Sequence, residues 1–335
     1  MDPLTQGVVG ATLAGAFAPK GLKRKAPVAG FCGGMTADLD VLIRSDADPL
    51  LTLQYHRHFT HALAFIPLGG ALTALALMAL PWLRRGLGWW RLYLFATLGY
   101  ATSGLIDACT SYGTYLYWPF SDARVAWNTM PILDPVYTGL LLFFLLLSVI
   151  NRRALFGWLG LAVGLGYPLL GEWQHRKAEA VIREVAAERG HAEVARLTAK
   201  PAPLSLLLWR TLYRHEDRYF VDALHVPFRG EARLYPGDST PARDFPEDFP
   251  QLPTDSRLYH DLARFHHFSG SYLYKPEGMQ HFVADLRYAM IPNSLEPLWG
   301  VRWEPGAYDT GVTFETFRTV DETKRKRFLE MLLGR

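Results

Sequence analysis

The sequence predicts a mainly α-helical fold, a polytopic helical membrane bundle of four to six spans followed by a small soluble α+β domain. Half of the 335 residues are hydrophobic. Most of the long apolar runs lie in the first 171 residues, and the remainder has the mixed, charged composition of a soluble protein. The length and this change in composition together favour two domains.

Six apolar segments account for the predicted spans. A helix needs about 20 apolar residues, with about 17 tolerated, to cross the hydrocarbon core of a bilayer. The last four segments meet this requirement, whereas the first two are short and rich in glycine, so the predicted number of spans lies between four and six. The segments are residues 3–19, 27–43, 60–81, 90–108, 133–150 and 154–171.

Basic residues alternate between the loops that join these segments. Residues 20–25, 84–91 and 151–153 hold nine basic residues, whereas residues 44–59 and 109–132 hold three. Cytoplasmic loops are enriched in lysine and arginine, so the first set is predicted to be cytoplasmic. The N-terminus, the two loops poor in basic residues and, with six spans, everything after the bundle are then expected on the non-cytoplasmic face.

The chain after residue 171 is predicted to be soluble. Residues 172–200 favour a charged connecting helix, with Gly190 as a break. Residues 201–335 contain short strand-like runs and are predicted to form the α+β domain. Within residues 264–289, two aromatic-rich strands are expected on either side of the turn sequence KPEG, with His266 and His267 at the start of a strand. No catalytic residue is assigned to this domain, and the sequence does not identify a protein partner for it.

The composition excludes several classes of protein. The formal net charge of +3 is too small to indicate nucleic-acid binding, and no basic stretch is interleaved with aromatic residues. Cys32 and Cys109 each lie inside an apolar run, which favours reduced, core-facing thiols over a disulfide or a thiolate metal site. The lipid bilayer is the partner that the sequence predicts.

Carboxylates and imidazoles gather at one end of the predicted spans. Ionisable residues in or at the edge of a membrane are costly and mark functional sites by default. Such groups converging from several helices are what divalent metals need. Interfacial histidines, and an aspartate pair that merely ends a helix, would give the same pattern. These residues are Asp2, Asp38, Asp40, His56, His58, His61, Asp107 and Asp134, and the amide of Gln6 lies with them.

Five motifs occur in order over roughly residues 1–140: MDPLTQGVVGA, ADLDVL, HRHFTHAL, DACTSYGTYLYWPFSDAR and ILDPVYT. They resemble the YdjM-like family of bacterial inner-membrane proteins, usually described as predicted membrane-bound metal-dependent hydrolases and thought distantly similar to the zinc-dependent phospholipase C and nuclease group. The resemblance implies a divalent ion, with zinc expected, and places Arg57 and Arg124 near the substrate. The chain departs from the family pattern at Gln6 and Ser103, where many relatives have histidine. The implied metal ligands are Asp38, Asp40, His56, His61 and Asp107.

The expected function is that of a membrane-embedded metal-dependent hydrolase that cleaves a phosphoester in a lipid or lipid-linked substrate. A metal-activated water would attack phosphorus, and Arg57 or Arg124 would stabilise the developing negative charge. Two alternatives stay open. An ion or proton transporter would need polar residues that continue along the helices, and the last two apolar segments almost lack them. A non-catalytic envelope protein would carry a structural or degenerate metal site, in keeping with Gln6 and Ser103.

Overall fold

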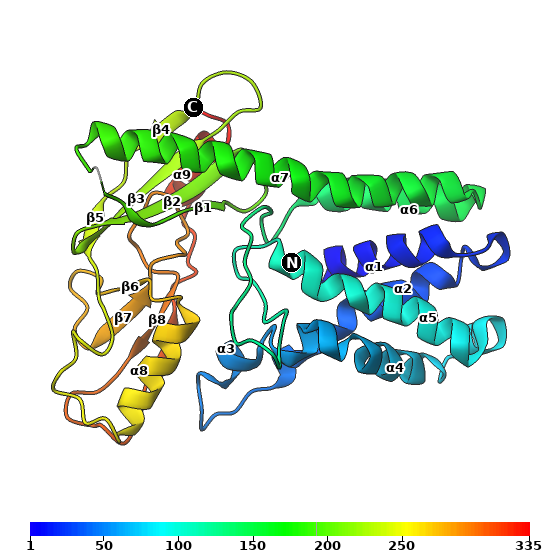
Figure 1. The fold of residues 1–335 in the computed structure, drawn as a ribbon, viewed down its shortest axis with the longest axis horizontal. Helices are drawn as coiled ribbons and strands as arrows, with labels where there is room; N and C mark the ends of the chain where they lie inside the picture. Colours follow the sequence, from blue (N-terminus) through cyan, green and yellow to red (C-terminus); the bar gives the residue numbers. More distant parts are fainter. Residues whose placement is uncertain (192) are drawn as a thin grey trace. The chain divides into compact units, whose positions relative to one another are not determined.

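The computed structural model describes residues 1–191 and 193–335, which divide into two compact units. Residue 192, which falls within the predicted connecting helix, lies outside the described residues. Figure 1 labels most of the helices and strands of both units. The first unit is residues 1–43 with residues 55–173, and the second is residues 44–54 with residues 174–335.

The first unit is helical. Its helices α1, α2, α4 and α5 lie side by side in Figure 1, and α1 also packs against α6. Short 3-10 turns join several of them. The main elements are α1 (Pro3–Phe17), α2 (Ala26–Thr36), α4 (Ile66–Leu77), α5 (Pro81–Ala108), α6 (Pro135–Asn151) and the first part of α7 (Ala154–Glu188). The short ones are η1 (Lys20–Leu22), η2 (Ala37–Leu42), η3 (Phe59–His61) and η4 (Leu63–Phe65).

Glycines let α1, α2 and α5 approach backbone to backbone. A Cβ atom on Gly10 of α1 or on Gly99 of α5 would overlap the carbonyl oxygen of Gly30 on α2. Small residues at helix interfaces permit such close approach. Near the end of α2, Gly34 likewise lies against the carbonyl oxygen of Gln6. This packing holds together the N-terminal end of α1 and the C-terminal ends of α2 and α5.

The predicted bundle of four to six membrane spans is wrong. In the described residues, α7 is the one helix long and apolar enough to cross a membrane. A second candidate arises only if residues 51–61 and 63–77, bent by 62° at the break between them, count as one span. The 15 residues of α1 rise about 22 Å, short of the ~30 Å hydrocarbon core. Helix α2, with 11 residues, is shorter still.

Two antiparallel sheets lie in the second unit. The first has the order β1-β2-β3-β4, and β5 also pairs with β3. The second has the order β6-β7-β8-β9. The first sheet contains β1 (Ala195–Pro201), β2 (Leu208–His215), β3 (Arg218–His225), β4 (Arg233–Tyr235) and β5 (Ser239–Pro241). The second contains β6 (Leu273–Tyr274), β7 (Phe282–Asp285), β8 (Trp299–Arg302) and β9 (Thr313–Thr316).

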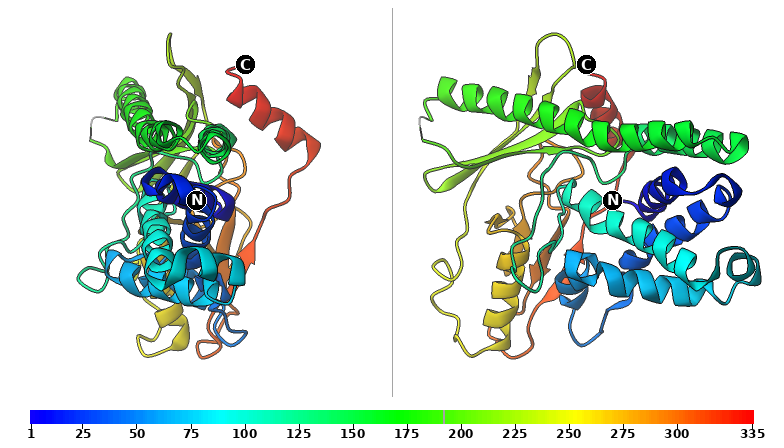
Figure 2. Two further views of the ribbon diagram at one scale, coloured as in Figure 1. Left: turned by 90° about the vertical axis from the view of Figure 1, so that its right-hand side faces the viewer. Right: turned by 45° about the vertical axis from the view of Figure 1, so that its right-hand side comes forward.

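Helices cover the first sheet. The last turns of α7 bury Ala178, Ile182 and Ala186 against Trp209, Tyr213 and Leu224 of β2 and β3, and α7 runs along these strands in Figures 1 and 2. The spacing of four residues puts the three α7 side chains on one helix face. Met331 of α9 (Glu322–Leu332) packs against Leu208 and Ala223. Two short helices, α3 (Leu51–Tyr55) and α8 (Arg257–Phe268), complete the structure.

The predicted connecting helix 172–200 is partly wrong, because β1 occupies its last residues. Helix α7 ends at Glu188, and Gly190 follows with φ +82°, a conformation in which glycine has no steric penalty. His266 and His267 lie on α8 and not at the start of a strand. Leu258, Leu262 and Phe265 form a buried stripe with helical spacing there.

Candidate metal centre

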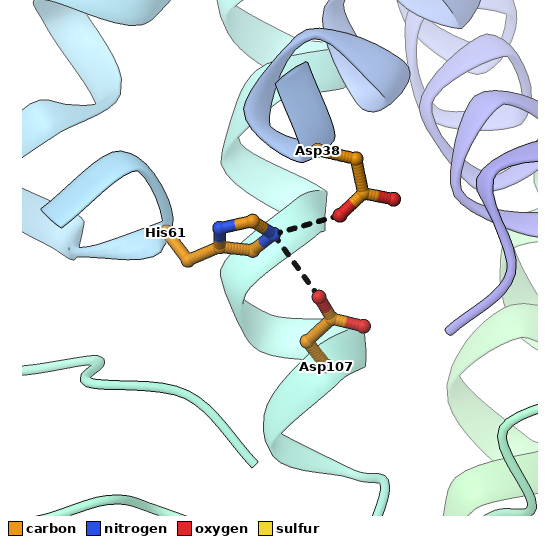
Figure 3. A group of neighbouring side chains, drawn as sticks. All are labelled: Asp38, His61 and Asp107. Carbon is orange, nitrogen blue, oxygen red and sulfur yellow. Dashed lines mark hydrogen bonds and ion pairs between the residues drawn. The ribbon is translucent and has the colours of Figure 1, made fainter. Parts of the chain in front are cut away.

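Three side chains from three separate elements meet in the first unit. Asp38 comes from η2, His61 from η3 and Asp107 from the last turn of α5. In Figure 3 the imidazole of His61 points toward both carboxylates. Its Nε2 atom lies 3.2 Å from Oδ1 of Asp38 and 3.1 Å from Oδ2 of Asp107. One ligand atom from each residue lies within 4.8 Å of the other two, an arrangement that could hold a metal ion.

Asp40 lies behind His61, on the other side of the ring. Its Oδ2 atom is 3.2 Å from Nδ1 of His61 and accepts a hydrogen bond of 2.7 Å from the Thr60 hydroxyl. Its Oδ1 atom is 2.7 Å from Nδ1 of His56. Histidines that bind metals commonly hydrogen-bond a carboxylate through the other ring nitrogen, which fixes the tautomer and the ring orientation. Asp40 and His56 are expected from the sequence as direct ligands; in the structure Asp40 contacts Nδ1 of His61, and His56 contacts Asp40.

The backbone at Arg57 is held in an unusual conformation. Its φ of +61° is in the left-handed region, which bulky residues rarely adopt. Its N–H donates to Asp40 Oδ2 at 2.8 Å, and its carbonyl oxygen accepts from Tyr115 N–H and the Thr114 hydroxyl, both at 3.1 Å. Such strain persists only where surrounding contacts enforce it, and it clusters at functional sites. This turn aims His61 at the two aspartates.

Arg57 and Arg124, the two arginines expected near the substrate, have different surroundings. The Arg57 guanidinium is buried, with Nε 3.1 Å from Asp107 Oδ2, and it also donates to the Thr110 hydroxyl at 3.1 Å. The amino nitrogen of Met1 contacts the other oxygen of Asp107. Arg124 lies against the rings of Tyr112 and Tyr115, with its Cζ atom 4.7 and 4.8 Å from their centroids, and it donates to the carbonyl oxygens of Tyr112 and His56.

Hydrogen bonds and ion pairs favour the ionised forms of Asp40 and Asp107. Burial alone would raise the pKa of Asp40, but hydrogen bonds from His56 and His61 outweigh it and hold that pKa well below its usual range. Burial opposes ionisation of Asp107 as well. The positive charge of Arg57 and the hydrogen bond from His61 outweigh it, so the pKa of Asp107 is also lowered. Anionic oxygens at neutral pH are the form that binds a cation.

Gln6 closes one side of the group. Its side chain is fully buried, and Nε2 donates to Asp38 Oδ1 at 3.3 Å and to Asp107 Oδ2 at 3.1 Å. Its Oε1 atom has no hydrogen-bond partner among the described residues. The nitrogen and oxygen of a glutamine amide are interchanged by a simple rotation. Ser103, the other departure from the family pattern, donates its hydroxyl to Gly34 O at 2.7 Å and does not join the group.

Other polar residues singled out in the sequence have local structural roles. Asp2 caps α1 by accepting from the Thr5 N–H, and Asp134 caps α6 by accepting from the Val136 and Tyr137 N–H groups. The His58 ring lies among aromatic side chains, with its centroid 4.6 Å from that of Tyr115. These three residues are not among the metal-ligand candidates.

Tyr100 supports the site and was missed by sequence reasoning. The hydroxyl of Tyr100 donates to the Thr60 carbonyl oxygen at 2.6 Å and so braces the turn that carries His61. A signal for it was present in the sequence, because Tyr100 precedes Asp107 by seven residues. Two helical turns separate residues so spaced, which puts them on the same helix face.

The donor set fits a divalent cation. Metal–ligand bonds of about 2.0–2.2 Å place neighbouring ligand atoms roughly 3–3.5 Å apart, as the two contacts of His61 Nε2 are. Three carboxylates surround one imidazole, and buried negative charge is costly unless cations balance it. Arg57 supplies one positive charge beside Asp107, whose other oxygen contacts the Met1 amino nitrogen. In the described part of the chain, the buried Oε1 atom of Gln6 has no hydrogen-bond partner.

Comparison with known proteins identifies the family of this chain. Among curated proteins and among solved structures, none gives a significant match. The family model described as YdjM inner membrane protein matches residues 1–177, which is more than half of the 335 residues and includes every residue of the candidate centre. The chain therefore belongs to the YdjM inner membrane protein family.

Proposed function

We propose that this inner membrane protein is a metal-dependent hydrolase that cleaves a phosphoester of a lipid or lipid-linked substrate. The convergence of Asp38, His61 and Asp107 carries the proposal, together with the Asp40 carboxylate behind the histidine. A cluster of carboxylates and an imidazole from separate elements is a donor set for zinc or manganese. The position of the group in a membrane protein favours a substrate that is itself a membrane component.

Each residue has a role that its contacts support. A divalent cation in this site would supply Lewis acidity and lower the pKa of a water molecule. Asp40 holds the His61 ring with Nε2 toward the cation site, and Arg57 positions the Asp107 carboxylate. His56 presents one ring nitrogen to Asp40 at 2.7 Å, and its side chain is 25% exposed. Arg124 provides a positive charge on the aromatic face of Tyr112 and Tyr115.

The experiment that tests this proposal measures bound metal and turnover on the same preparations. The full chain is purified in detergent and analysed for metals, both as isolated and after loading with zinc or manganese. Phosphatidic acid in mixed micelles serves as the probe for phosphoester hydrolysis, read as released phosphate. We expect near-stoichiometric metal and metal-dependent phosphate release in the parent. Both should be lost in the His61→Ala and Asp107→Asn variants.

Asp134→Asn is the matched control, because Asp134 is also a buried aspartate but caps α6 and lies outside the group. It should bind metal as the parent does. A parent without bound metal after loading, or turnover that does not depend on any divalent ion, would reject the hydrolase proposal. Metal bound equally well by the His61 and Asp107 variants would reject this location for the site.

A further inference from the structure

A cavity of about 430 Å³ lies in the first unit beside the candidate metal centre. This volume is within the range of roughly 300–1,000 Å³ that small-molecule sites occupy. We infer that the cavity holds the hydrocarbon chain of the lipid phosphoester whose headgroup reaches Asp38, His61 and Asp107. The inference rests on the proposed function and deepens it, because it assigns the part of the substrate that the metal centre does not contact.

The walls of the cavity match a hydrocarbon chain. Elements α2, η2, α4 and α5 contribute to them, and most of the lining side chains are apolar. Leu39, Ile43, Phe65, Leu72, Ala76 and Leu77 provide these apolar walls. A flexible chain gains free energy from leaving water at about 0.8 kcal/mol for each buried CH₂ group. No lysine or arginine lines the cavity in the described part of the chain, so a soluble anion finds no cation there.

One end of the cavity joins the metal centre. Asp40 and Thr60 line the cavity, and both contact Nδ1 of His61, at 3.2 and 3.0 Å. Tyr100 lines it too, and its hydroxyl donates to the Thr60 carbonyl oxygen. The oxygens of Asp40 are already engaged by His56, Arg57, Thr60 and His61. At this end of the cavity, the hydrocarbon chain of the lipid would therefore meet its headgroup, and Asp40 would not form a separate polar site.

Two of the leucines that line the cavity are exposed at the surface of the protein. Leu39 is 59% exposed and Leu72 is 50% exposed, although both line the cavity. Leu72 and Ala76 belong to α4, part of the bent pair of apolar helices that passes as a candidate membrane span. Large exposed apolar side chains on a membrane protein are suited to contact with lipid. The hydrocarbon chain of a lipid can pass these leucines from the bilayer into the cavity without crossing water.

The experiment uses phosphatidic acid with a photoreactive diazirine in one acyl chain, added in mixed micelles to the full chain. Cross-linked peptides are mapped by mass spectrometry. We expect cross-links to concentrate in residues 32–43 and 65–77. The Ala76→Trp variant fills the cavity from an exposed position and should lower cross-linking in these segments at least fivefold. Leu72→Trp, one helical turn away, should act in the same direction.

Leu75→Trp is the matched control, because Leu75 is 63% exposed on the same helix but does not line the cavity. It should leave cross-linking unchanged. Cross-links spread evenly over the exposed faces of α6 and α7, or equal yields in Ala76→Trp and the parent, would overturn the inference. Metal content is measured on every variant and should stay at the parent level. Cross-linking in the cavity of a protein that binds no metal would reject the hydrolase proposal but would still support the cavity as the binding site of the hydrocarbon chain.

Discussion

The Nδ1 atom of His61 lies 3.2 Å from an oxygen of Asp40, and Nε2 of the same ring faces Asp38 and Asp107. This relationship divides the aspartates into two kinds. In the proposed metal site, Asp38 and Asp107 would offer oxygens to a cation, and Asp40 would hold the histidine that binds beside them. Residues that orient a metal-binding histidine typically contribute 10–100-fold to metal affinity, less than removal of a ligand costs.

Replacing Asp40 with asparagine should therefore weaken metal binding without abolishing it. We expect the affinity for zinc or manganese, measured by calorimetric titration, to fall about 10–100-fold, because the neutral amide holds the His61 ring less firmly. Asp107→Asn should lose binding altogether. His56→Gln, which removes another partner of Asp40 but leaves the His61 contact, should have a smaller effect than Asp40→Asn. If Asp40→Asn and Asp107→Asn are equally deficient, Asp40 is a ligand.

Replacing Gln6 with leucine should also lower metal affinity. The Gln6 amide contacts both Asp38 and Asp107, and rotation of the amide would turn Oε1 toward a cation between them. We expect a loss of about tenfold in Gln6→Leu, in the range that a supporting contact provides. Gln6→Glu, which adds a negative charge, should bind manganese more tightly than the parent. Manganese titration followed by electron paramagnetic resonance measures both.

Ser103→Ala is the control for Gln6. The Ser103 side chain is as deeply buried as that of Gln6, but its hydroxyl donates to Gly34 and not to the metal-ligand candidates. Its metal affinity should equal that of the parent. An unchanged affinity in Gln6→Leu would show that the amide oxygen does not reach the cation.

Much of the helical framework was predictable from the sequence, but its relation to the membrane was not. The predicted segments 90–108 and 133–150 fall within or near α5 (Pro81–Ala108) and α6 (Pro135–Asn151). Apolar content identifies such helices because both a membrane and a protein core bury apolar side chains. Apolar content does not determine the length of a helix. Helices α1 and α2, which were expected as possible membrane spans, bury their glycine-rich faces against each other.

The sequence identified the candidate residues but did not predict how they are arranged. Motif order identified Asp38, His61 and Asp107 together with Asp40 and His56, and the family match bears out the resemblance. The proposed role of each aspartate depends on which nitrogen of the His61 ring it faces. Asp40 faces Nδ1, whereas Asp38 and Asp107 face Nε2. That choice is set by the left-handed turn at Arg57 and the position of Thr60, both of which are tertiary features. Periodicity alone contains no information about them.

In the second unit, Lys200 should make stability depend on pH. Burial, aided by the positive charge of Arg287, lowers the pKa of Lys200 from about 10.5 to about 7, although Asp285 acts in the opposite direction. Between these two values the unfolded chain binds a proton that the folded chain does not. The free energy of unfolding therefore rises with pH across this window, and below pH 7 the folded state carries a buried charge at full cost.

The variant Lys200→Met should lack this contribution. Its melting temperature should exceed that of the parent at pH 6, and the difference should shrink between pH 7 and pH 10 as the parent gains stability. Lys275→Met, a change at an exposed lysine, is the control and should follow the parent across the range. A constant difference between Lys200→Met and the parent over this interval would contradict the prediction.

Arg264 of α8 should determine the order of residues 44–54. Its guanidinium contacts both carboxylate oxygens of Asp48, at 3.0 and 2.9 Å, and the side-chain oxygen of Gln54 at 2.9 Å. Residues 44–54 form the segment of the polypeptide between η2, which carries Asp38, and the turn that carries His61. Because Arg264 and Asp48 are partly exposed, the pair contributes on the order of 1 kcal/mol.

The variant Arg264→Lys keeps the positive charge but loses the two-pronged contact with Asp48. Amide hydrogen exchange in residues 45–54 should accelerate roughly fivefold, as the loss of on the order of 1 kcal/mol in local stability requires. Arg196→Lys is the control, since Arg196 donates to Gly270 O and lies on the Tyr272 ring. It should leave exchange in residues 45–54 unchanged. Equal exchange rates in Arg264→Lys and the parent would mean that the rest of the second unit holds this segment without Arg264, and that its order does not depend on the Asp48 ion pair.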